Sequence, residues 1–216
     1  MEILLKTCLV VPPLFIAMVL HEIAHALAAE KCGDQTARNM GRVTLNPIKH
    51  IDPVMTIALP ALLIFSGSPI IFGGAKPVPV NPAFFKNPKS NMGFVAAAGP
   101  VTNVIIAAIS FLLFVIVMQL GVLTILPHLV AQLVYGWLLY SIIINIVLCL
   151  FNLLPVPPLD GGRIAVSLLP MRGAQALARL EPYGLIIIVA LLYFGIVEAF
   201  LGPVLEFVID ALEQWG

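Results

Sequence analysis

Charged residues are scarce in this chain. They make up 10% of its 216 residues, and no Lys, Arg, Asp or Glu occurs from Ser90 to Leu159. About one quarter of a soluble domain is charged, whereas this sequence is 61% hydrophobic and has a mean hydropathy of +1.07. The shortage of charge excludes an ordinary soluble domain and predicts a multi-pass helical protein in the lipid bilayer. The formal net charge of zero offers no basic surface, so no nucleic-acid partner is expected.

Cysteines and a cleavable leader are also lacking. Cys8, Cys32 and Cys149 are far apart, with no pair at metal-ligand spacing, so they are interpreted as small apolar fillers. The N-terminus has no basic region followed by a small-residue cleavage site. The first apolar run is therefore interpreted as a retained membrane span.

Apolar segments alternate with polar or proline-rich stretches. Residues 34–50 contain a short Arg-Val-Thr-Leu run that predicts a small membrane-associated β-hairpin, and the four prolines of 73–91 predict an extended loop. The expected fold is an all-α polytopic membrane protein with about 4–5 apolar helical segments. The parts of this single domain, 1–216, are a helix at 8–31, the hairpin at 34–50, a re-entrant or interfacial segment at 53–72, the Pro-rich loop at 73–91, spans at 92–120 and 129–152, a loop at 153–163 and a C-terminal span at 183–205.

Basic residues predict the topology. Ten of the eleven Lys and Arg residues fall within 31–49, 76–89 and 163–179. The positive-inside rule places these three stretches in the cytoplasm and the turn at 121–128 outside. That arrangement requires that 53–72 does not cross the membrane, and the prolines of this segment favour the same interpretation.

The stretch HEIAH at residues 21–25 is the main chemical signal. Positions i and i+4 share one face of a helix, so His21 and His25 can bind one Zn²⁺. Glu22, rotated around the helix, can reach a zinc-bound water as general base. The alternative is two buried histidines and a glutamate bonded to neighbours. Ionisable groups inside an apolar span are costly and usually functional, which favours the metal site.

A catalytic zinc needs a third protein ligand, and Asp160 in FNLLPVPPLDGGR is the leading candidate. The alternative is an aspartate in a turn at the end of a span. If 53–72 does not cross, spans 8–29 and 129–152 run in the same direction and bring Asp160 to the level of the histidines. Asn103 and Asn152 could hold substrate or an oxyanion, or could form hydrogen bonds between helices.

Several stretches together resemble the site-2 protease family of intramembrane zinc metalloproteases. These are HEIAH (21–25), AAGPVTN (97–103) and NLLPVPPLDGG (152–162), and GGAKPVPVNP (73–82) is similar to the compact prokaryotic members without PDZ or CBS domains. The resemblance implies His21, His25 and Asp160 as zinc ligands, Glu22 as general base and Asn152 as a residue that holds substrate or oxyanion. It also implies a multi-pass protein of a prokaryotic cell membrane, and the distribution of basic residues predicts an active site near the cytoplasmic side.

Two classes of function are compatible with these residues. The first is a zinc-dependent intramembrane endopeptidase that cuts membrane-anchored proteins within or near their transmembrane segments, as in regulated intramembrane proteolysis. An unwound substrate could add as a strand to the hairpin at 36–48 or the loop at 73–82. The alternative is a zinc-binding transporter or a catalytically inactive scaffold. The sequence shows no inverted repeat typical of transporters, and it retains Glu22.

Overall fold

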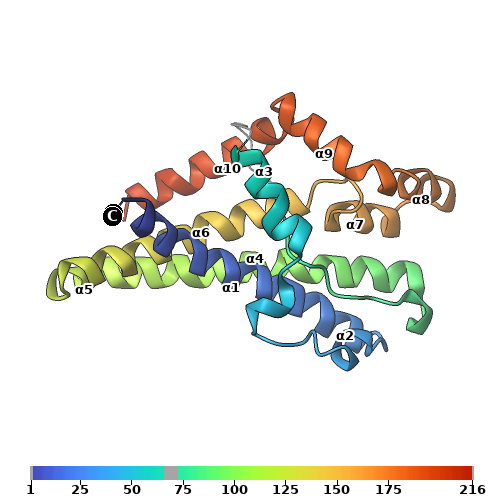
Figure 1. The fold of residues 1–216 in the computed structure, drawn as a ribbon, viewed down its shortest axis with the longest axis horizontal. Helices are drawn as coiled ribbons and strands as arrows, with labels where there is room; N and C mark the ends of the chain where they lie inside the picture. Colours follow the sequence, from blue (N-terminus) through green and yellow to red (C-terminus); the bar gives the residue numbers. More distant parts are fainter. Residues whose placement is uncertain (1, 66–72, 216) are drawn as a thin grey trace.

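The computed structural model describes residues 2–65 and 73–215, and these residues fold into helices joined by short loops (Figure 1). The α-helices are α1 (Glu2–Lys31), α2 (Thr36–Asn39), α3 (Leu59–Phe65), α4 (Pro88–Gln119), α5 (Val122–Ile125), α6 (His128–Asn152), α7 (Asp160–Leu168), α8 (Met171–Ala178), α9 (Gly184–Tyr193) and α10 (Ile196–Glu213). The 3-10 helices are η1 (Pro47–His50), η3 (Pro82–Phe84) and η4 (Glu181–Tyr183), and η2 (Pro53–Ala58) is a π-helix that continues into α3.

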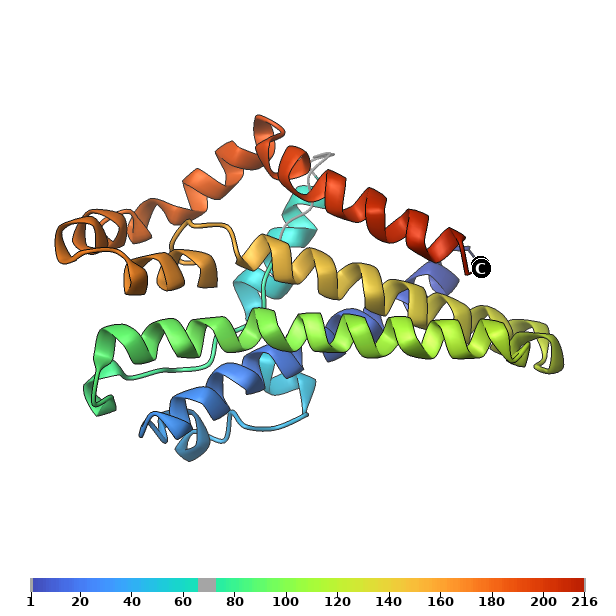
Figure 2. The same ribbon diagram turned by 180° about the vertical axis from the view of Figure 1, so that it is seen from behind.

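Three long helices, α1, α4 and α6, lie side by side and form the centre of the molecule (Figures 1 and 2). The helices α1 and α6 run in the same direction, and α4 runs against both. Near the start of α1, the indole of Trp137 donates a hydrogen bond to the carbonyl of Cys8 over 2.8 Å. Gly136 lets the two helices approach, because a Cβ there would lie 2.5 Å from the side chain of Leu9. The opposite ends of the same two helices meet at the candidate site.

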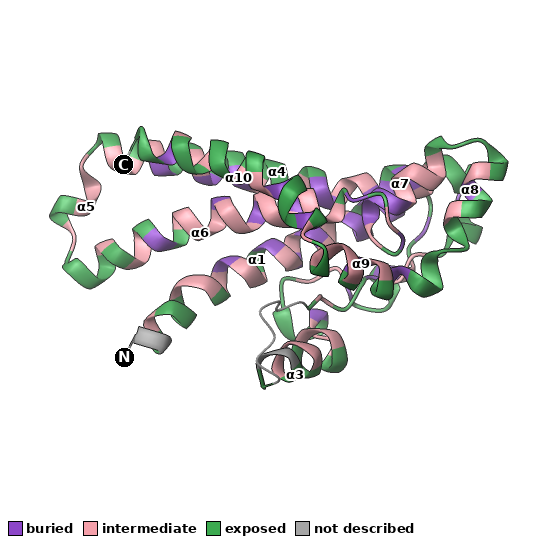
Figure 3. Ribbon diagram, turned by 90° about the horizontal axis from the view of Figure 1, so that it is seen from above, coloured by how far each residue is buried: buried purple, intermediate pink, exposed green. Residues whose placement is uncertain are grey.

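The outer faces of these helices are apolar and exposed, as the green bands on the long helices in Figure 3 show. Within the described part of the chain, four segments are long and apolar enough to cross a bilayer: Leu4–Lys31, Pro88–Gln119, His128–Asn152 and Met171–Tyr193. Exposed apolar surface of this extent is stable in lipid and unstable in water. The protein is therefore an integral membrane protein.

The expected β-hairpin at 34–50 is wrong, since no strand occurs in residues 2–65 or 73–215. The stretch instead forms α2, a turn and η1. Gly33 and Gly41, with φ of 106° and 65°, end α1 and α2 in left-handed conformations. The N–H groups of Asp34 and Arg42 then donate to carbonyls five residues earlier, those of Ala29 and Ala37. These are Schellman ends, so the Gly-Asp and Gly-Arg pairs stop helices here.

Segment 53–72 is helical as far as the structure describes it. Asp52 caps the first turn by accepting hydrogen bonds from the N–H groups of Val54 and Met55, and η2 and α3 follow to Phe65. Residues 66–72 lie outside the described range. The expectation that 53–72 does not cross the membrane therefore remains a prediction.

The expected C-terminal span at 183–205 differs from the structure, which divides it into α9 and α10. The break is at Gly195, whose φ of 68° is left-handed and whose N–H closes the end of α9 on the carbonyl of Leu192. The two helices form an inverted V beside the central bundle (Figure 1). The helix α10 then packs on α6 through Val197, Leu201 and Leu212.

Candidate metal centre

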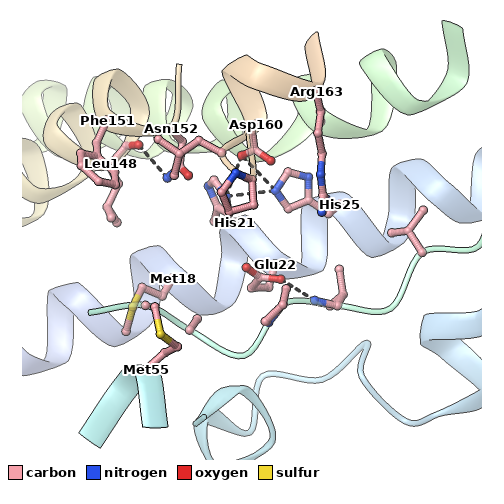
Figure 4. Close-up of a pocket in the computed structure, with 18 of the residues that line it drawn as sticks. Met18, His21, Glu22, His25, Met55, Leu148, Phe151, Asn152, Asp160 and Arg163 are labelled. Atoms are coloured by element: carbon pink, nitrogen blue, oxygen red, sulfur yellow. Dashed lines mark hydrogen bonds and ion pairs between the residues drawn. The ribbon is translucent and has the colours of Figure 1, made fainter. Parts of the chain in front are cut away.

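His21 and His25 lie on the face of α1 that is packed against α4, and both side chains are buried. Their Nε2 atoms are 3.0 Å apart. The carboxylate oxygen Oδ2 of Asp160 lies 3.2 Å from Nε2 of His21 and 3.3 Å from Nε2 of His25 (Figure 4). The structure thus brings together the three ligands expected from the sequence, one ligand atom from each.

Asp160 reaches the histidines because the chain folds back tightly after α6. It is the first residue of α7, and two glycines follow it. A Cβ at Gly161 would lie 2.2 Å from the carbonyl oxygen of Leu153, and one at Gly162 would lie 2.3 Å from the nitrogen of Pro157. The glycine pair is therefore required for α7 to start directly against the end of α6.

The orientation of each imidazole is set from α4. Nδ1 of His25 lies 2.8 Å from the carbonyl oxygen of Val95, and Nδ1 of His21 lies 2.5 Å from Oδ1 of Asn103. A backbone carbonyl can only accept, so Nδ1 of His25 carries the proton and Nε2 presents a lone pair. Metal-binding histidines typically donate their second ring N–H in this way.

The tautomer of His21 follows from a chain of buried amides. Nδ2 of Asn145 donates to the carbonyl of Ser141 over 2.8 Å, so its Oδ1 is the atom that accepts from Nδ2 of Asn103, also over 2.8 Å. Oδ1 of Asn103 is then left to accept from Nδ1 of His21. Both asparagine side chains are fully buried between α4 and α6. The structure places Asn103 behind His21, where it does not line the cavity described below.

Gly99 completes the face that α4 presents to the site. A Cβ at this position would lie 2.5 Å from Cε1 of His21 and 2.5 Å from Nε2 of His25. Val95, Gly99 and Asn103 are spaced by four residues and therefore share one face of the helix. This face supplies the carbonyl of Val95, the space left by the missing side chain of Gly99 and the amide of Asn103. The two imidazoles occupy the space at Gly99.

The residues present fit a zinc ion. With both Nδ1 atoms protonated, three atoms with lone pairs face one another across 3.0–3.3 Å, and Oδ2 of Asp160 is buried with no hydrogen-bond donor. Such an arrangement is repulsive unless a cation lies between the atoms. Ligand bonds of about 2.0–2.1 Å in a tetrahedral zinc site separate the ligand atoms by about 3.3–3.4 Å. The observed separations are close to that value.

The metal ligands open into a cavity of about 460 Å³ between the helices. Glu22 lines it, and its Oε2 accepts a hydrogen bond from the N–H of Val78 over 2.7 Å (Figure 4). Asn152 also lines the cavity, while its Nδ2 donates to the carbonyl of Leu148 over 2.9 Å. Arg163 is the cation among the lining residues. Most of the remaining lining is apolar, with side chains such as Met18, Met55, Met92, Leu148, Phe151, Leu185 and Ile188.

The site consists of two histidines and an aspartate around one point, and a glutamate lines the same cavity between apolar helices. This arrangement is typical of a membrane-embedded metalloprotease of the HExxH class. Comparison with known proteins gives the same class. The model of peptidase family M50 matches residues 10–137 and 120–195, and the chain belongs to this family, the site-2 proteases.

Relatives with related names match over most of the chain. "Putative zinc metalloprotease YwhC" of Bacillus subtilis (strain 168) is 42% identical over 195 residues, which cover 89% of this chain and 84% of that protein. "Putative zinc metalloprotease Rip2" of Mycolicibacterium smegmatis is 29% identical over 85% of this chain and 66% of its own length. Rip2 of Mycobacterium tuberculosis (strain H37Rv) is 25% identical over 84% of this chain and 68% of its own length. No solved structure matches the chain.

Proposed function

We propose that this protein is a zinc-dependent intramembrane endopeptidase that hydrolyses peptide bonds within or near the transmembrane segments of membrane-anchored proteins. The observation that carries the proposal is the convergence of the three ligand atoms of His21, His25 and Asp160 in the cavity that Glu22 also lines. Membership of a protease family and four apolar helices support it.

The chemistry divides between the metal and the chain. Zinc held by His21, His25 and Asp160 would polarise the scissile carbonyl and lower the pKa of a water molecule at the site. The carboxylate of Glu22 accepts the proton of that water and then delivers it to the nitrogen of the leaving amine. Asn152 lies across the cavity from Glu22 in Figure 4, where its amide can hold the substrate backbone or the developing oxyanion. The apolar lining receives the side chains of a membrane-embedded peptide.

A substrate helix must unwind first, because its carbonyls are bonded within the helix. The extended segment 73–80 is suited to receive the unwound strand. The N–H of Gly74 donates to the carbonyl of Met55, and that of Lys76 donates to the carbonyl of His50. The N–H of Val78 donates to the carboxylate of Glu22. Residues alternate in direction along an extended chain, so the intervening residues face the other way. Pro77 and Pro79 have no N–H, so that edge can pair with a substrate mainly through carbonyls, and the carbonyl of Pro77 already accepts from Arg42 over 3.3 Å.

The charge distribution supports a cytoplasmic site. His21, His25 and Asp160 lie at the end of the bundle that carries the basic stretches 31–49 and 163–179. By the positive-inside rule this end faces the cytoplasm of a prokaryotic cell. Membrane-anchored regulators, cut in regulated intramembrane proteolysis, are the class of substrate that fits this location.

The test is cleavage of a membrane-anchored reporter by the purified protein in lipid vesicles. Glu22→Gln should reduce the rate about 100-fold to 10,000-fold, because it removes the proton acceptor, and should retain bound zinc. Glu206→Gln, on the exposed face of α10, is the matched control and should cut at the wild-type rate. Equal cleavage by wild type and Glu22→Gln would exclude Glu22 as the base. A wild-type protein that binds zinc and cuts no reporter would favour the transporter or scaffold.

A further inference from the structure

Glu22 is held by a hydrogen bond from the segment 73–81, whereas the imidazoles of His21 and His25 are held from α4. Oε2 of Glu22 accepts from the N–H of Val78 over 2.7 Å, the contact drawn as a dashed line from Glu22 in Figure 4. Pro77 and Pro79 flank Val78 and have no N–H. The amide of Val78 is therefore the one backbone donor between Lys76 and Val80, and it is bonded to the proposed base.

The segment that carries this donor, residues 73–81, has no regular secondary structure. Its position depends on contacts made by side chains and loops around it. The guanidinium of Arg42 donates to the carbonyl of Lys76 over 2.7 Å and to that of Pro77 over 3.3 Å. At the far end, the N–H of Asn81 donates to Oδ2 of Asp34 over 2.6 Å. The two contacts of Arg42 fall on the residues directly before Val78.

Arg42 is itself built into a fixed position. It follows Gly41, and its N–H closes the Schellman end of α2 on the carbonyl of Ala37. Its side chain is only 7% exposed, and the hydrogen bonds described for it go to neutral carbonyls. Burial of a charge without a counter-ion is costly. A buried arginine that holds two consecutive carbonyls next to the donor for Glu22 is the arrangement expected when the backbone there must not move.

We propose that Arg42 is a positioning residue for Glu22, and that it acts by holding the backbone of Lys76 and Pro77 so that the N–H of Val78 orients the Glu22 carboxylate in the cavity. The inference rests on the proposed function of Glu22 as the base. It assigns to segment 73–81 a second role, distinct from contact with substrate. The metal ligands are oriented from α4, and the base is oriented from this segment.

The first experiment compares Arg42→Gln with Arg38→Gln in the reporter assay. Arg38 is the matched control, because it lies on α2, directly before the turn that carries Arg42, is 53% exposed and pairs with Glu30 instead of the segment. Misplacement of a reacting group by about 1 Å can cost about 100-fold in rate. Arg42→Gln should therefore lower kcat by about 10-fold to 100-fold, with KM within about twofold and bound zinc unchanged, and Arg42→Lys should restore part of the rate. Wild-type kcat in Arg42→Gln, or loss of zinc equal to the loss of rate, would overturn the proposal.

The second experiment measures the contact without any cleavage. Hydrogen exchange is followed in a peptide that covers Pro77–Pro79, where Val78 has the one exchangeable amide. Exchange at Val78 should rise by about tenfold or more in Glu22→Ala and in Arg42→Gln, in line with the loss of a native hydrogen bond, and should stay at the wild-type rate in Arg38→Gln. Unchanged exchange in Arg42→Gln would overturn the proposal. A wild-type protein that cuts no reporter but shows this exchange pattern would contradict the proposed function alone.

Discussion

The two sides of α1 hold their functional groups in different ways. On one side, His21 and His25 are packed against a long rigid helix, and the groups that orient them are a backbone carbonyl and a buried amide of α4. On the other side, Glu22 is bonded to a segment without secondary structure, which arginine and aspartate side chains fix in place. Metal ligands must keep constant distances, whereas the base borders the cavity that segment 73–81 also lines. The difference suggests that rigidity is concentrated on the metal side.

The largest effect is expected from Gly99→Ala, which tests the metal side. The added Cβ would lie 2.5 Å from Cε1 of His21 and 2.5 Å from Nε2 of His25, so the imidazoles would have to shift. We expect zinc affinity to fall by about 100-fold or more, at the upper end for groups that support metal ligands, with cleavage lost in parallel. Bound zinc is measured by metal analysis of the purified protein. Gly202→Ala on α10, where a Cβ meets nothing within 4 Å, is the control. Normal zinc content in Gly99→Ala would show that α4 is not the rigid side.

The chain of buried amides predicts a graded series. Asn103→Leu removes the acceptor of His21 and should weaken zinc binding by about 10-fold to 100-fold. Asn145→Leu leaves Oδ1 of Asn103 in place but removes the partner that orients the Asn103 amide. The zinc affinity should therefore fall by less than about tenfold. Competition with a zinc chelator measures both affinities. Ser110→Ala is the control, because the hydrogen bond of its hydroxyl, among the described residues, is with that of Ser141 and not with either asparagine. An Asn103→Leu protein with wild-type affinity would contradict the assigned role of this residue.

Asp34 tests how the segment 73–81, which carries the hydrogen-bond donor of Glu22, is held in place. Burial raises the pKa of its carboxyl, but hydrogen bonds from the Thr36 hydroxyl and from the N–H groups of Asn81 and Thr36 lower it below the ordinary value. A lowered pKa stabilises the fold above the unfolded pKa of about 3.9, and this contribution is lost as the pH falls through the lower folded pKa. At pH 7, Asp34→Asn should lower the free energy of unfolding by about 1–3 kcal/mol.

The difference between wild type and Asp34→Asn should shrink below about pH 4. Denaturant unfolding in detergent at neutral and acidic pH measures it. Asp210→Asn, on the exposed face of α10, serves as control. A difference that persists unchanged at acidic pH would mean that the carboxylate charge does not fix the segment.

The smallest effect is expected from Gly41→Ala. Space is available, since a Cβ there meets nothing within 4 Å, but the φ of 65° is left-handed. The cost of that conformation for alanine is roughly 1 kcal/mol, and it acts on the turn that places Arg42. A modest fall in the unfolding midpoint should therefore accompany faster exchange at Val78. Gly173→Ala, inside α8 with ordinary contacts, should show neither change.

The three residues of the candidate metal centre were predictable from the sequence, and the groups that orient them were not. His21 and His25 follow from helical spacing, and Asp160 follows from its place at the end of a charge-free stretch. The role of Asn103 depends on the register of α4 against α1, which no local pattern specifies. The four-residue spacing of Gly99 and Asn103 was the available signal. Asn145 was not distinguishable from an asparagine that packs between helices.

The errors in the fold have local causes. The Arg-Val-Thr-Leu run predicts a hairpin at 34–50, but Gly33 and Gly41, each followed by a polar residue, end helices there. Gly195 breaks the predicted C-terminal span because its left-handed φ turns the chain between two apolar helices. Hydropathy is equally high on both sides of that break, so composition alone could not locate it. Val78 was missed because a backbone N–H has no sequence signature.

The buried amides also bear on how this protein reaches the membrane. A charged residue at the centre of a helix costs about 2.5–3.5 kcal/mol during insertion through the translocon. The groups that support His21 and His25 are an amide and a backbone carbonyl, and α4 and α6 carry no charged side chain after Lys89. Both helices can therefore enter the bilayer as neutral segments before any metal is bound. The carboxylate of Asp160 follows α1, α4 and α6 in the chain, at the start of α7.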